Sequence, residues 1–447
     1  MTRAYVLRRR LLGAGLSAVP AVAALAACAP RDTGRGAGGP SQPGPTTLVF
    51  LTRASENHRQ IFDRLAQEFQ KVQPNMTVNQ EFVPGGTPAF LEKETTLVAA
   101  GQQADVVFNE AIRWREAAAK GLYEVLDPYL VKEKQLLADV FPYFVDIGKW
   151  QGKNYATPID PSMYVMIYNL RMWQSAGVPP PDPKQPLTWQ EFTDRSRRLT
   201  KEQDGKFTQF GYDGANVHDV LLLFQQASGK TPFNADFSRW NLDQGEAITQ
   251  IQFLADMRRS HKAASWPAAP TDGPVTWENG RVGTTIRGVW GAGTWRRQLP
   301  DEWDWAPYPQ LAGKKRLTAG RGSGLSMGSH TKHKAATWEF MKWTLGVPAQ
   351  EIYLSMGASQ PLTKSMATNP AWTQPTPPKN KQVVLDEMQY GVAPWFFAGA
   401  ARFLTLFEPA LASVWNGEKT AHQMITELTP QVTQLLAQLK SEFGGRI

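Results

Sequence analysis

The sequence has only one cysteine, Cys28, in 447 residues. One cysteine excludes an intrachain disulfide and any metal site built from several thiolates. The six histidines are scattered, and only His330 and His333 lie close together, so the sequence predicts no metal-binding cluster. A G-x-x-x-x-G-K-[ST] string is also missing, which argues against ATP hydrolysis by this chain. We therefore expect neither a metal nor a cofactor.

Most of the chain also lacks a strong excess of charge of one sign. Lys and Arg number 48 against 40 Asp and Glu, a formal net charge of +8. Four of the arginines, Arg3, Arg8, Arg9 and Arg10, lie in the first ten residues, so the remainder carries 44 minus 40, or +4. This ordinary balance argues against nucleic acid as a partner.

Long hydrophobic runs are absent except near the N-terminus. A basic segment is followed by the uncharged residues 11–27, and this order is typical of a secretory signal. No other window approaches the roughly 18 to 20 apolar residues of a membrane span, so we expect no transmembrane helix in the mature protein. The string Leu25-Ala-Ala-Cys28 resembles a bacterial lipobox, which implies a diacylglycerol on the Cys28 thiol. An incidental free thiol is the alternative, and the general-secretion and twin-arginine export routes both stay open.

The segment after the signal is rich in Gly, Pro, Ser and Thr and cannot bury much apolar area. We therefore predict a signal peptide at residues 1–27, followed by a lipidated N-terminus and a flexible tether at residues 28–46.

Short apolar segments then alternate with amphipathic ones. Residues 47–51 predict a strand, and apolar residues recur at helical spacing between Asn57, the expected helix cap, and Pro74. Further strands are predicted at 76–82 and 105–108, with a helix between them. This order predicts an α/β fold with a mainly parallel sheet.

Further helices are predicted later in the chain. Thr188 with Glu191, and Thr420 with Gln423, form capping boxes that mark helix starts. Residues 332–345 carry apolar side chains on one helical face, and we expect that face to lie in the core.

Six motifs follow one another in a fixed order along the mature chain. They are the opening strand and helix at 48–78, Gly101–Val107, Gly121–Asp127, Gly152–Pro158 followed by Tyr168-Asn169, Thr188–Phe192 and Trp277–Trp290. Together they resemble the extracellular solute-binding proteins of ABC importers, family 1, the group that includes maltose-binding protein. One departure is Arg281-Val-Gly-Thr284, where the family usually has Lys-x-Ala-Met.

The resemblance implies a two-lobe periplasmic-binding-protein fold, with a mainly parallel sheet in each lobe and a hinge of crossing segments. We expect an N-terminal lobe at 47–160 plus 318–360 and a C-terminal lobe at 161–317 plus 361–447. The expected crossings lie near Pro158–Tyr164, Arg316–Leu325 and Gly357–Thr363.

The sequence holds sixteen tryptophans, and Trp114, Trp290 and Trp395 lie in predicted loops, whereas Trp338 and Trp343 are expected in the core. Sugar sites combine aromatic platforms with planar hydrogen-bonding groups, and ligands of α/β sheets bind at the loops after strand ends. These rules and the resemblance give the candidate ligand-binding residues Arg53, Glu56, Asn57, Asn109, Glu110, Arg113, Trp114, Asp160, Tyr164, Trp290, Arg321 and Trp395. The resemblance places Asn109 where maltose-binding protein has an aromatic ligand contact, which argues against a long maltodextrin.

Two enzymatic readings compete with the receptor. Gly324-Leu-Ser326-Met-Gly328 fits the G-x-S-x-G string of a hydrolase, with His333 or His422 and Asp386 as partners, but the segment leading into it is basic and Gly-rich. A glycoside hydrolase would need two carboxylates, and Asp301-Glu302 and Asp304 are clustered. Adjacent acids on a polar segment are usually solvated.

We therefore expect a non-enzymatic, monomeric receptor, anchored by lipid to the outer face of the cell membrane. It would capture a mono- or oligosaccharide by hinge closure and deliver it to ABC permease subunits. A non-sugar solute such as glycerol phosphate or a glycerophosphodiester is the alternative ligand. Inward-pointing Arg53, Arg113 and Arg321 would favour an anion, whereas one arginine plus two carboxylates among aromatics would favour a neutral sugar.

Overall fold

The computed structural model describes residues 45–53, 56–84, 87–299, 303–392 and 395–447. The predicted signal peptide, Cys28 and nearly all of the tether lie outside the described residues. Within these ranges, no helix combines the length and apolar character that a membrane crossing requires.

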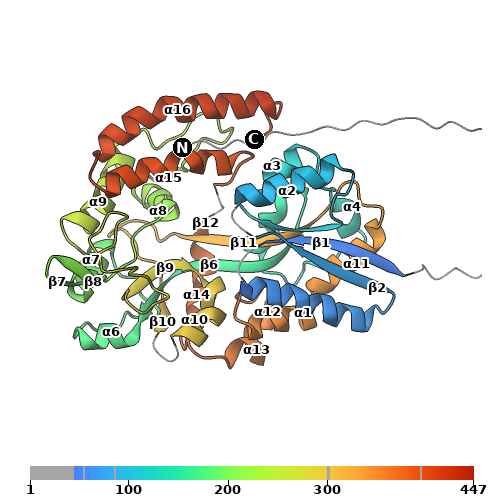
Figure 1. Cartoon of the computed structure of the whole chain (residues 1–447), viewed down its shortest axis with the longest axis horizontal. Helices are drawn as coiled ribbons and strands as arrows, with labels where there is room; N and C mark the ends of the chain where they lie inside the picture. The colour runs from blue at the N-terminus through green and yellow to red at the C-terminus, as the bar shows by residue number, and fades with distance from the viewer. Residues whose placement is uncertain (1–44, 54–55, 85–86, 300–302, 393–394) are drawn as a thin grey trace, which may run out of the picture. The chain divides into compact units, whose positions relative to one another are not determined.

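The described strands include one eight-stranded sheet, which runs through the middle of the structure in Figure 1. Its path is β10-β6-β11-β3-β1-β2, with β12 paired to β11 and β9 paired to β6. The bounds are β1 Thr46–Thr52, β2 Met76–Phe82, β3 Val106–Glu110, β6 Thr157–Asn169, β9 Thr284–Gly288, β10 Trp303–Ala306, β11 Thr318–Met327 and β12 Gly391–Val392. Two short hairpins stand apart, β4 Lys149–Trp150 with β5 Lys153–Asn154 and β7 Lys201–Gln203 with β8 Lys206–Gln209.

The helices cover this sheet and the segments around it. They are α1 Glu56–Val72, α2 Thr87–Ala99, α3 Trp114–Ala119, α4 Asp127–Leu130, α5 Pro142–Val145, α6 Leu170–Ser175, α7 Trp189–Leu199, α8 Val217–Ser228, α9 Gly245–Arg259, α10 Ala292–Gln298, α11 Lys334–Thr344, α12 Val347–Ser355, α13 Pro370–Thr373, α14 Gln382–Glu387, α15 Ala400–Trp415 and α16 Ala421–Glu442.

The predicted parallel pairing holds for the first three strands. β1 pairs in parallel with β2 on one side and with β3 on the other. The strand predicted at 76–82 is confirmed as β2, and β3 continues to Glu110, beyond the predicted end. The prediction that Asn57 caps the first helix is wrong, because α1 begins at Glu56 and Asn57 lies within its first turn.

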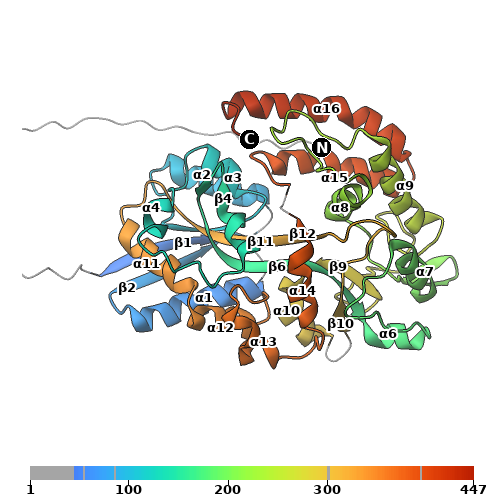
Figure 2. The same ribbon diagram turned by 180° about the vertical axis from the view of Figure 1, so that it is seen from behind.

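Two long strands carry the sheet from one half of the structure into the other. The first half of β6 pairs with β11, and its second half pairs with β9 and β10, all in antiparallel register. β11 pairs with β3 as well, so it joins β6 to the parallel strands. The sheet is therefore mixed, and the prediction of a mainly parallel sheet in each lobe is wrong outside β1, β2 and β3, because β6 and β11 pair antiparallel with their main neighbours. Figure 2 shows α14 beside β6, and β12 beside β11, on this central part.

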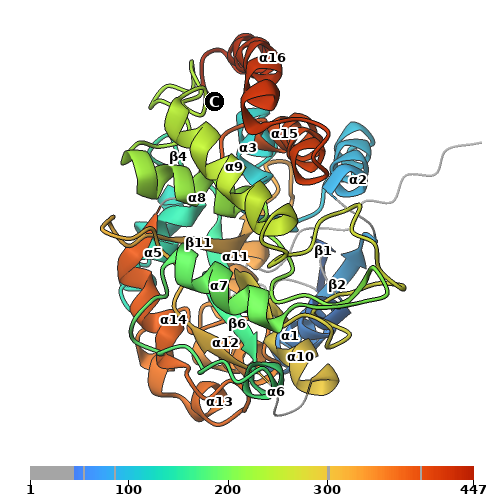
Figure 3. The same ribbon diagram turned by 90° about the vertical axis from the view of Figure 1, so that its left-hand side faces the viewer.

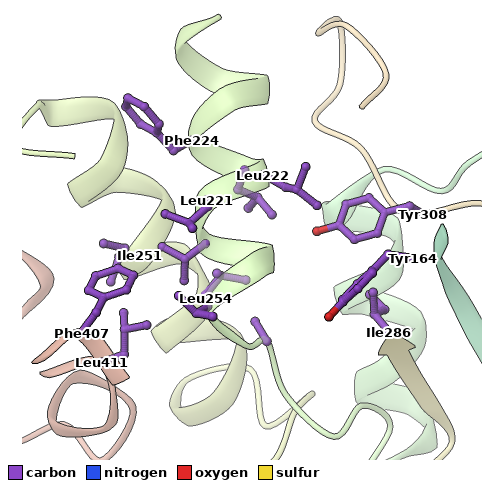
Figure 4. Packing of buried hydrophobic residues seen from close by; sticks show 14 of the residues in the cluster. Tyr164, Leu221, Leu222, Phe224, Ile251, Leu254, Ile286, Tyr308, Phe407 and Leu411 are labelled. Carbon is purple, nitrogen blue, oxygen red and sulfur yellow. The ribbon is translucent and has the colours of Figure 1, made fainter. Parts of the chain in front are cut away.

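Separate buried clusters form on the two sides of these strands. Around β1–β3, the rings of Phe50, Phe62, Phe69 and Phe340 pack edge to face at 5.1 to 5.6 Å. On the other side, α8, α9, α15 and α16 pack together (Figure 3). Figure 4 shows part of that cluster, including Leu221 and Leu222 of α8. We call the elements around the first cluster, with α4, the first lobe. The elements around the second cluster, with α7 and the segment around Trp290, are the second lobe.

The two predicted capping boxes are confirmed. The Thr188 side chain accepts from the backbone N–H of Glu191 at 3.1 Å, and the Glu191 carboxylate accepts from the N–H of Thr188 at 2.8 Å. Thr420 and Gln423 form the same reciprocal pair at the start of α16. The helix predicted at 332–345 corresponds to α11, and its Phe340 is buried in the core.

Candidate solute-binding site

A cavity of about 300 Å³ lies where β1 and β3 end beside the central strands β6 and β11. The short 3-10 helix Val289–Gly291, which follows β9, supplies another wall. The lining residues are Arg53, His58, Phe108, Glu110, Ala111, Asp160, Ser162, Trp290, Arg321, Gly322 and Ser323. They come from segments far apart in the sequence, and both lobes contribute to the cavity.

An ion pair stands at the ends of the parallel strands. Arg53 follows β1 and Glu110 ends β3, and the Arg53 Nη1 donates to Glu110 Oε2 at 2.5 Å. The two side chains are only 15% and 28% exposed. This pair supplies donors and acceptors to the cavity without adding net charge.

A second polar pair lies deeper, between α1 and β6. His58 Nε2 and Asp160 Oδ2 are 3.2 Å apart, and both residues are buried. The His58 ring packs against the rings of Phe62 and Phe108, at 6.1 Å from each. The other carboxylate oxygen, Asp160 Oδ1, is buried and has no hydrogen-bond partner among the described residues. A buried acceptor without a partner is costly, so a donor from a ligand would stabilise it.

Trp290 and Arg321 line another wall of the cavity, and the predicted site residue Tyr164 is not a lining residue but is buried in contact with both of them. Trp290 is half-buried and meets the Tyr164 ring edge to face at 5.9 Å. The Arg321 Nη1 donates to the Tyr164 hydroxyl at 3.3 Å, and its guanidinium carbon lies 5.4 Å from the Phe396 ring. Burial raises the pKa of Tyr164, while Arg321 opposes that shift, so the phenol stays neutral.

The Trp290 ring occupies space that is open only because residue 288 is glycine. A Cβ at residue 288 would lie 1.9 Å from the Trp290 ring and 2.4 Å from Ser162 Oγ. We expect Gly288→Ala to displace the indole and to lower the free energy of unfolding by about 1 to 3 kcal/mol through overpacking. Thermal unfolding and near-ultraviolet circular dichroism measure both effects. Gly245→Ala is the matched control, since nothing lies within 4 Å of a Cβ there. Equal spectra and stability for the two variants would contradict this packing.

Several predicted site residues lie outside the cavity lining. Glu56 is exposed and pairs with Arg59 at 3.7 Å. Asn57 is buried, and its Nδ2 donates to the Met356 carbonyl at 3.5 Å. Trp395 is half-buried among Phe396, His218 and Phe403. It lines a much smaller pocket that shares Arg321 with the cavity.

The residues predicted around the end of β3 divide between two faces. Phe108 and Glu110 line the cavity, and strand alternation directs Asn109 to the opposite face, where its Oδ1 accepts from the Tyr123 hydroxyl at 3.0 Å. The Arg113 guanidinium stacks on Phe90 at 3.9 Å and donates to the Phe108 carbonyl at 3.0 Å. Burial lowers the pKa of Arg113.

Trp114 also lies away from the cavity. It is 1% exposed and packs in a cluster with Leu51, Phe90 and Val107. It therefore supports the strands that carry Arg53 and Glu110.

Among the polar lining residues, His58, Ser162 and Ser323 were not predicted from the sequence. The alternation of β6, in which Asp160 and Tyr164 were already candidates, would have added Ser162. His58 carried no comparable signal, because its position depends on where α1 begins.

A larger groove of about 1110 Å³ lies elsewhere, between α1, α12 and α13. Its charged lining residues include Arg64 and Lys71, which pair with Glu68 at 2.7 and 2.8 Å. The 300 Å³ cavity is the better candidate site, since it brings buried polar atoms and an aromatic ring together.

The structure gives no support to the two enzymatic readings. Ser326 is fully buried inside β11, opposite Val107 of β3, whereas a nucleophile elbow requires a turn between a strand and a helix. Asp301 and Glu302 lie outside the described residues. Asp304 is buried, not solvated, and accepts from the backbone N–H groups of Trp305, Lys379 and Asn380 at 2.8 to 3.1 Å.

The fold and the cavity define a class of protein, namely a two-lobe α/β receptor for a small polar solute. The sequence model of the bacterial extracellular solute-binding proteins matches residues 55–351. The chain belongs to this family.

Similar proteins agree with this assignment. A putative binding protein of Brucella abortus is 25% identical over 286 residues, which are 63% of this chain and 67% of the relative. An ABC substrate-binding protein from Listeria monocytogenes, solved in complex with cycloalternan, has a TM-score of 0.78 at 20% identity, covering 88% of this chain and 99% of the other. UgpB from Mycobacterium tuberculosis, in complex with glycerophosphocholine, has a TM-score of 0.73 at 17% identity, covering 89% and 99%. At these identities the two solved structures establish the fold.

Proposed function

We propose that this chain is the receptor of an ABC importer, and that it captures a mono- or oligosaccharide in the cavity and delivers it to the permease. The exported protein would be held at the outer face of the membrane by a lipid on Cys28. The observation that carries the proposal is the composition of the cavity, which combines the Trp290 ring with two arginines and two carboxylates.

The balance of charge favours a neutral ligand. Among the lining residues, Arg53 and Arg321 oppose Glu110 and Asp160. Arg113 is not a lining residue, although its Nε lies 3.9 Å from Glu110 Oε2. A sugar offers an apolar ring face to an aromatic side chain and a ring of hydroxyls to donors and acceptors. The unpartnered Asp160 Oδ1 is placed to accept from such a hydroxyl.

The position of these groups suits capture by closure. Arg53 and Glu110 belong to the first lobe, whereas Trp290 belongs to the second. A ligand shifts a conformational equilibrium only by its differential affinity for the two states. A solute that touches both walls would therefore favour the closed arrangement.

The test is a ligand titration of residues 29–447, which omit the signal and the lipidated cysteine. Binding is monitored by intrinsic tryptophan fluorescence. The panel contains neutral mono- and oligosaccharides, glycerol phosphate and a glycerophosphodiester. We expect saturable quenching or enhancement with at least one neutral sugar. Saturation by a phosphorylated ligand alone would overturn the carbohydrate assignment, and release of reducing ends from an oligosaccharide would restore the glycoside hydrolase.

A further inference from the structure

One arginine links the two lobes away from the crossing strands. The guanidinium of Arg402, in the first turn of α15, forms a two-point ion pair with Glu442 of α16 at 2.6 and 2.9 Å. The Arg402 Nη2 also donates to Glu116 Oε1 of α3 at 2.7 Å. Lys120, one turn along α3, binds the same Glu116 oxygen at 2.8 Å.

The partners of Arg402 are packed in different lobes. α3 is buried through Trp114, Ala117 and Ala118 in the cluster around Leu51 and Phe90. α15 and α16 pack on each other and on α9 in the second lobe. The Arg402–Glu116 contact therefore joins two separately packed bodies without a covalent connection between them.

This contact flanks the cavity described above. α3 follows Glu110 in the sequence, and α15 follows Trp395 and Phe396, whose ring lies beside Arg321. A rotation of one lobe about β6 and β11 changes the distance between α3 and α15, because α3 packs in the first lobe and α15 in the second. In this structure both lobes line the cavity, and the ion pair between Arg402 and Glu116 is formed.

We propose that Arg402 is a positioning residue for solute capture, and that its ion pair with Glu116 favours the closed arrangement without touching the solute. Glu442 holds the guanidinium fork in one orientation, so that the remaining N–H groups face Glu116. The role in capture rests on the proposed function, whereas the effect on the distance between the lobes does not.

The size of the effect follows from the exposure of the three side chains. Arg402 is 39% exposed and Glu442 40%, but Glu116 is only 11% exposed. Ion pairs near the surface are modest and are screened by salt. We expect loss of the pair to raise the ratio of open to closed molecules by about two- to fivefold. The apparent affinity for a solute falls by up to the same factor.

The experiment measures the distance between the lobes in residues 29–447. This part of the chain contains no cysteine, so Val131→Cys on the first lobe and Lys184→Cys on the second provide two exposed dye positions for single-molecule energy transfer. The variants are Arg402→Ala, Glu116→Ala and the double variant. Lys440→Ala is the matched control, because it removes one positive charge from α16 and an ion pair with Asp236 at 2.8 Å within the second lobe.

We expect both single variants to shift the population toward longer distances and the double variant to add little, because both changes remove the same contact. The control leaves the distribution unchanged, and raising the salt concentration moves the unaltered protein in the direction of Arg402→Ala. An unchanged distribution in Arg402→Ala, or an equal shift in Lys440→Ala, would overturn the proposal. The measurement needs no ligand, so it decides the matter even where every sugar in the titration fails to bind.

Discussion

Replacing Trp290 with alanine is expected to weaken solute binding by about 30-fold, or about 2 kcal/mol. The indole is half-buried in the cavity wall and is held by Tyr164 and by the close approach of Gly288. Its loss removes a preformed flat surface for an apolar sugar face. Isothermal titration calorimetry with the sugar identified by fluorescence measures the change.

The matched control for this prediction is Trp343→Ala. Trp343 is also half-buried, but it packs on Phe69 at 5.5 Å in the first lobe, outside the cavity lining. We expect the control to lose some thermal stability and to keep its affinity. If Trp290→Ala binds as tightly as the unaltered protein, the ring is a packing residue and the wall is wrongly assigned.

Asp160→Asn is expected to weaken binding by about tenfold to a hundredfold. The substitution keeps the shape of the side chain but replaces a charged acceptor by an amide, and hydrogen bonds to charged groups contribute about 1.5 to 3 kcal/mol. Asp160 Oδ1 is the buried acceptor without a partner, and Asp160 Oδ2 is already engaged by His58 at 3.2 Å. Calorimetry again provides the measurement.

Asp127→Asn is the control for Asp160→Asn. The Asp127 carboxylate accepts two hydrogen bonds from Asn154 at 2.9 Å and lies outside the lining of this cavity. We expect the Asp127→Asn variant to bind the solute as tightly as the unaltered protein does. Equal affinities for the two variants would mean that Asp160 serves the hinge strand rather than the ligand.

Local sequence patterns predict several elements of the fold correctly. The alternating strand at 76–82 and the capping box of Thr188 with Glu191 appear as predicted, because each depends on residues close together in the chain. The crossing segments predicted near 158–164 and 316–325 overlap β6 and β11, although the assignment of residues to lobes stays a prediction. These strands explain how Asp160 and Arg321 reach the same cavity as Arg53.

The direction of side chains near strand ends could not be predicted in the same way. β3 extends to Glu110, and the N–H of Arg113 then donates to the Glu110 carbonyl at 3.0 Å in a tight turn. That turn starts α3 and buries Trp114, so a segment that looked like a ligand-facing loop becomes support for the sheet. Asn109 turns away because β3 continues through it, and successive residues of a strand face opposite sides of the sheet. These outcomes depend on backbone geometry that residue types alone do not determine.

We propose that the solute binds between Trp290, Asp160 and Arg321. The most direct test is a crystal structure of residues 29–447 grown with the ligand found by titration. We expect a solute with one ring face on the Trp290 indole and a hydroxyl within hydrogen-bond distance of Asp160 Oδ1. A solute bound instead in the groove between α1 and α12, with this cavity filled only by water, would contradict it.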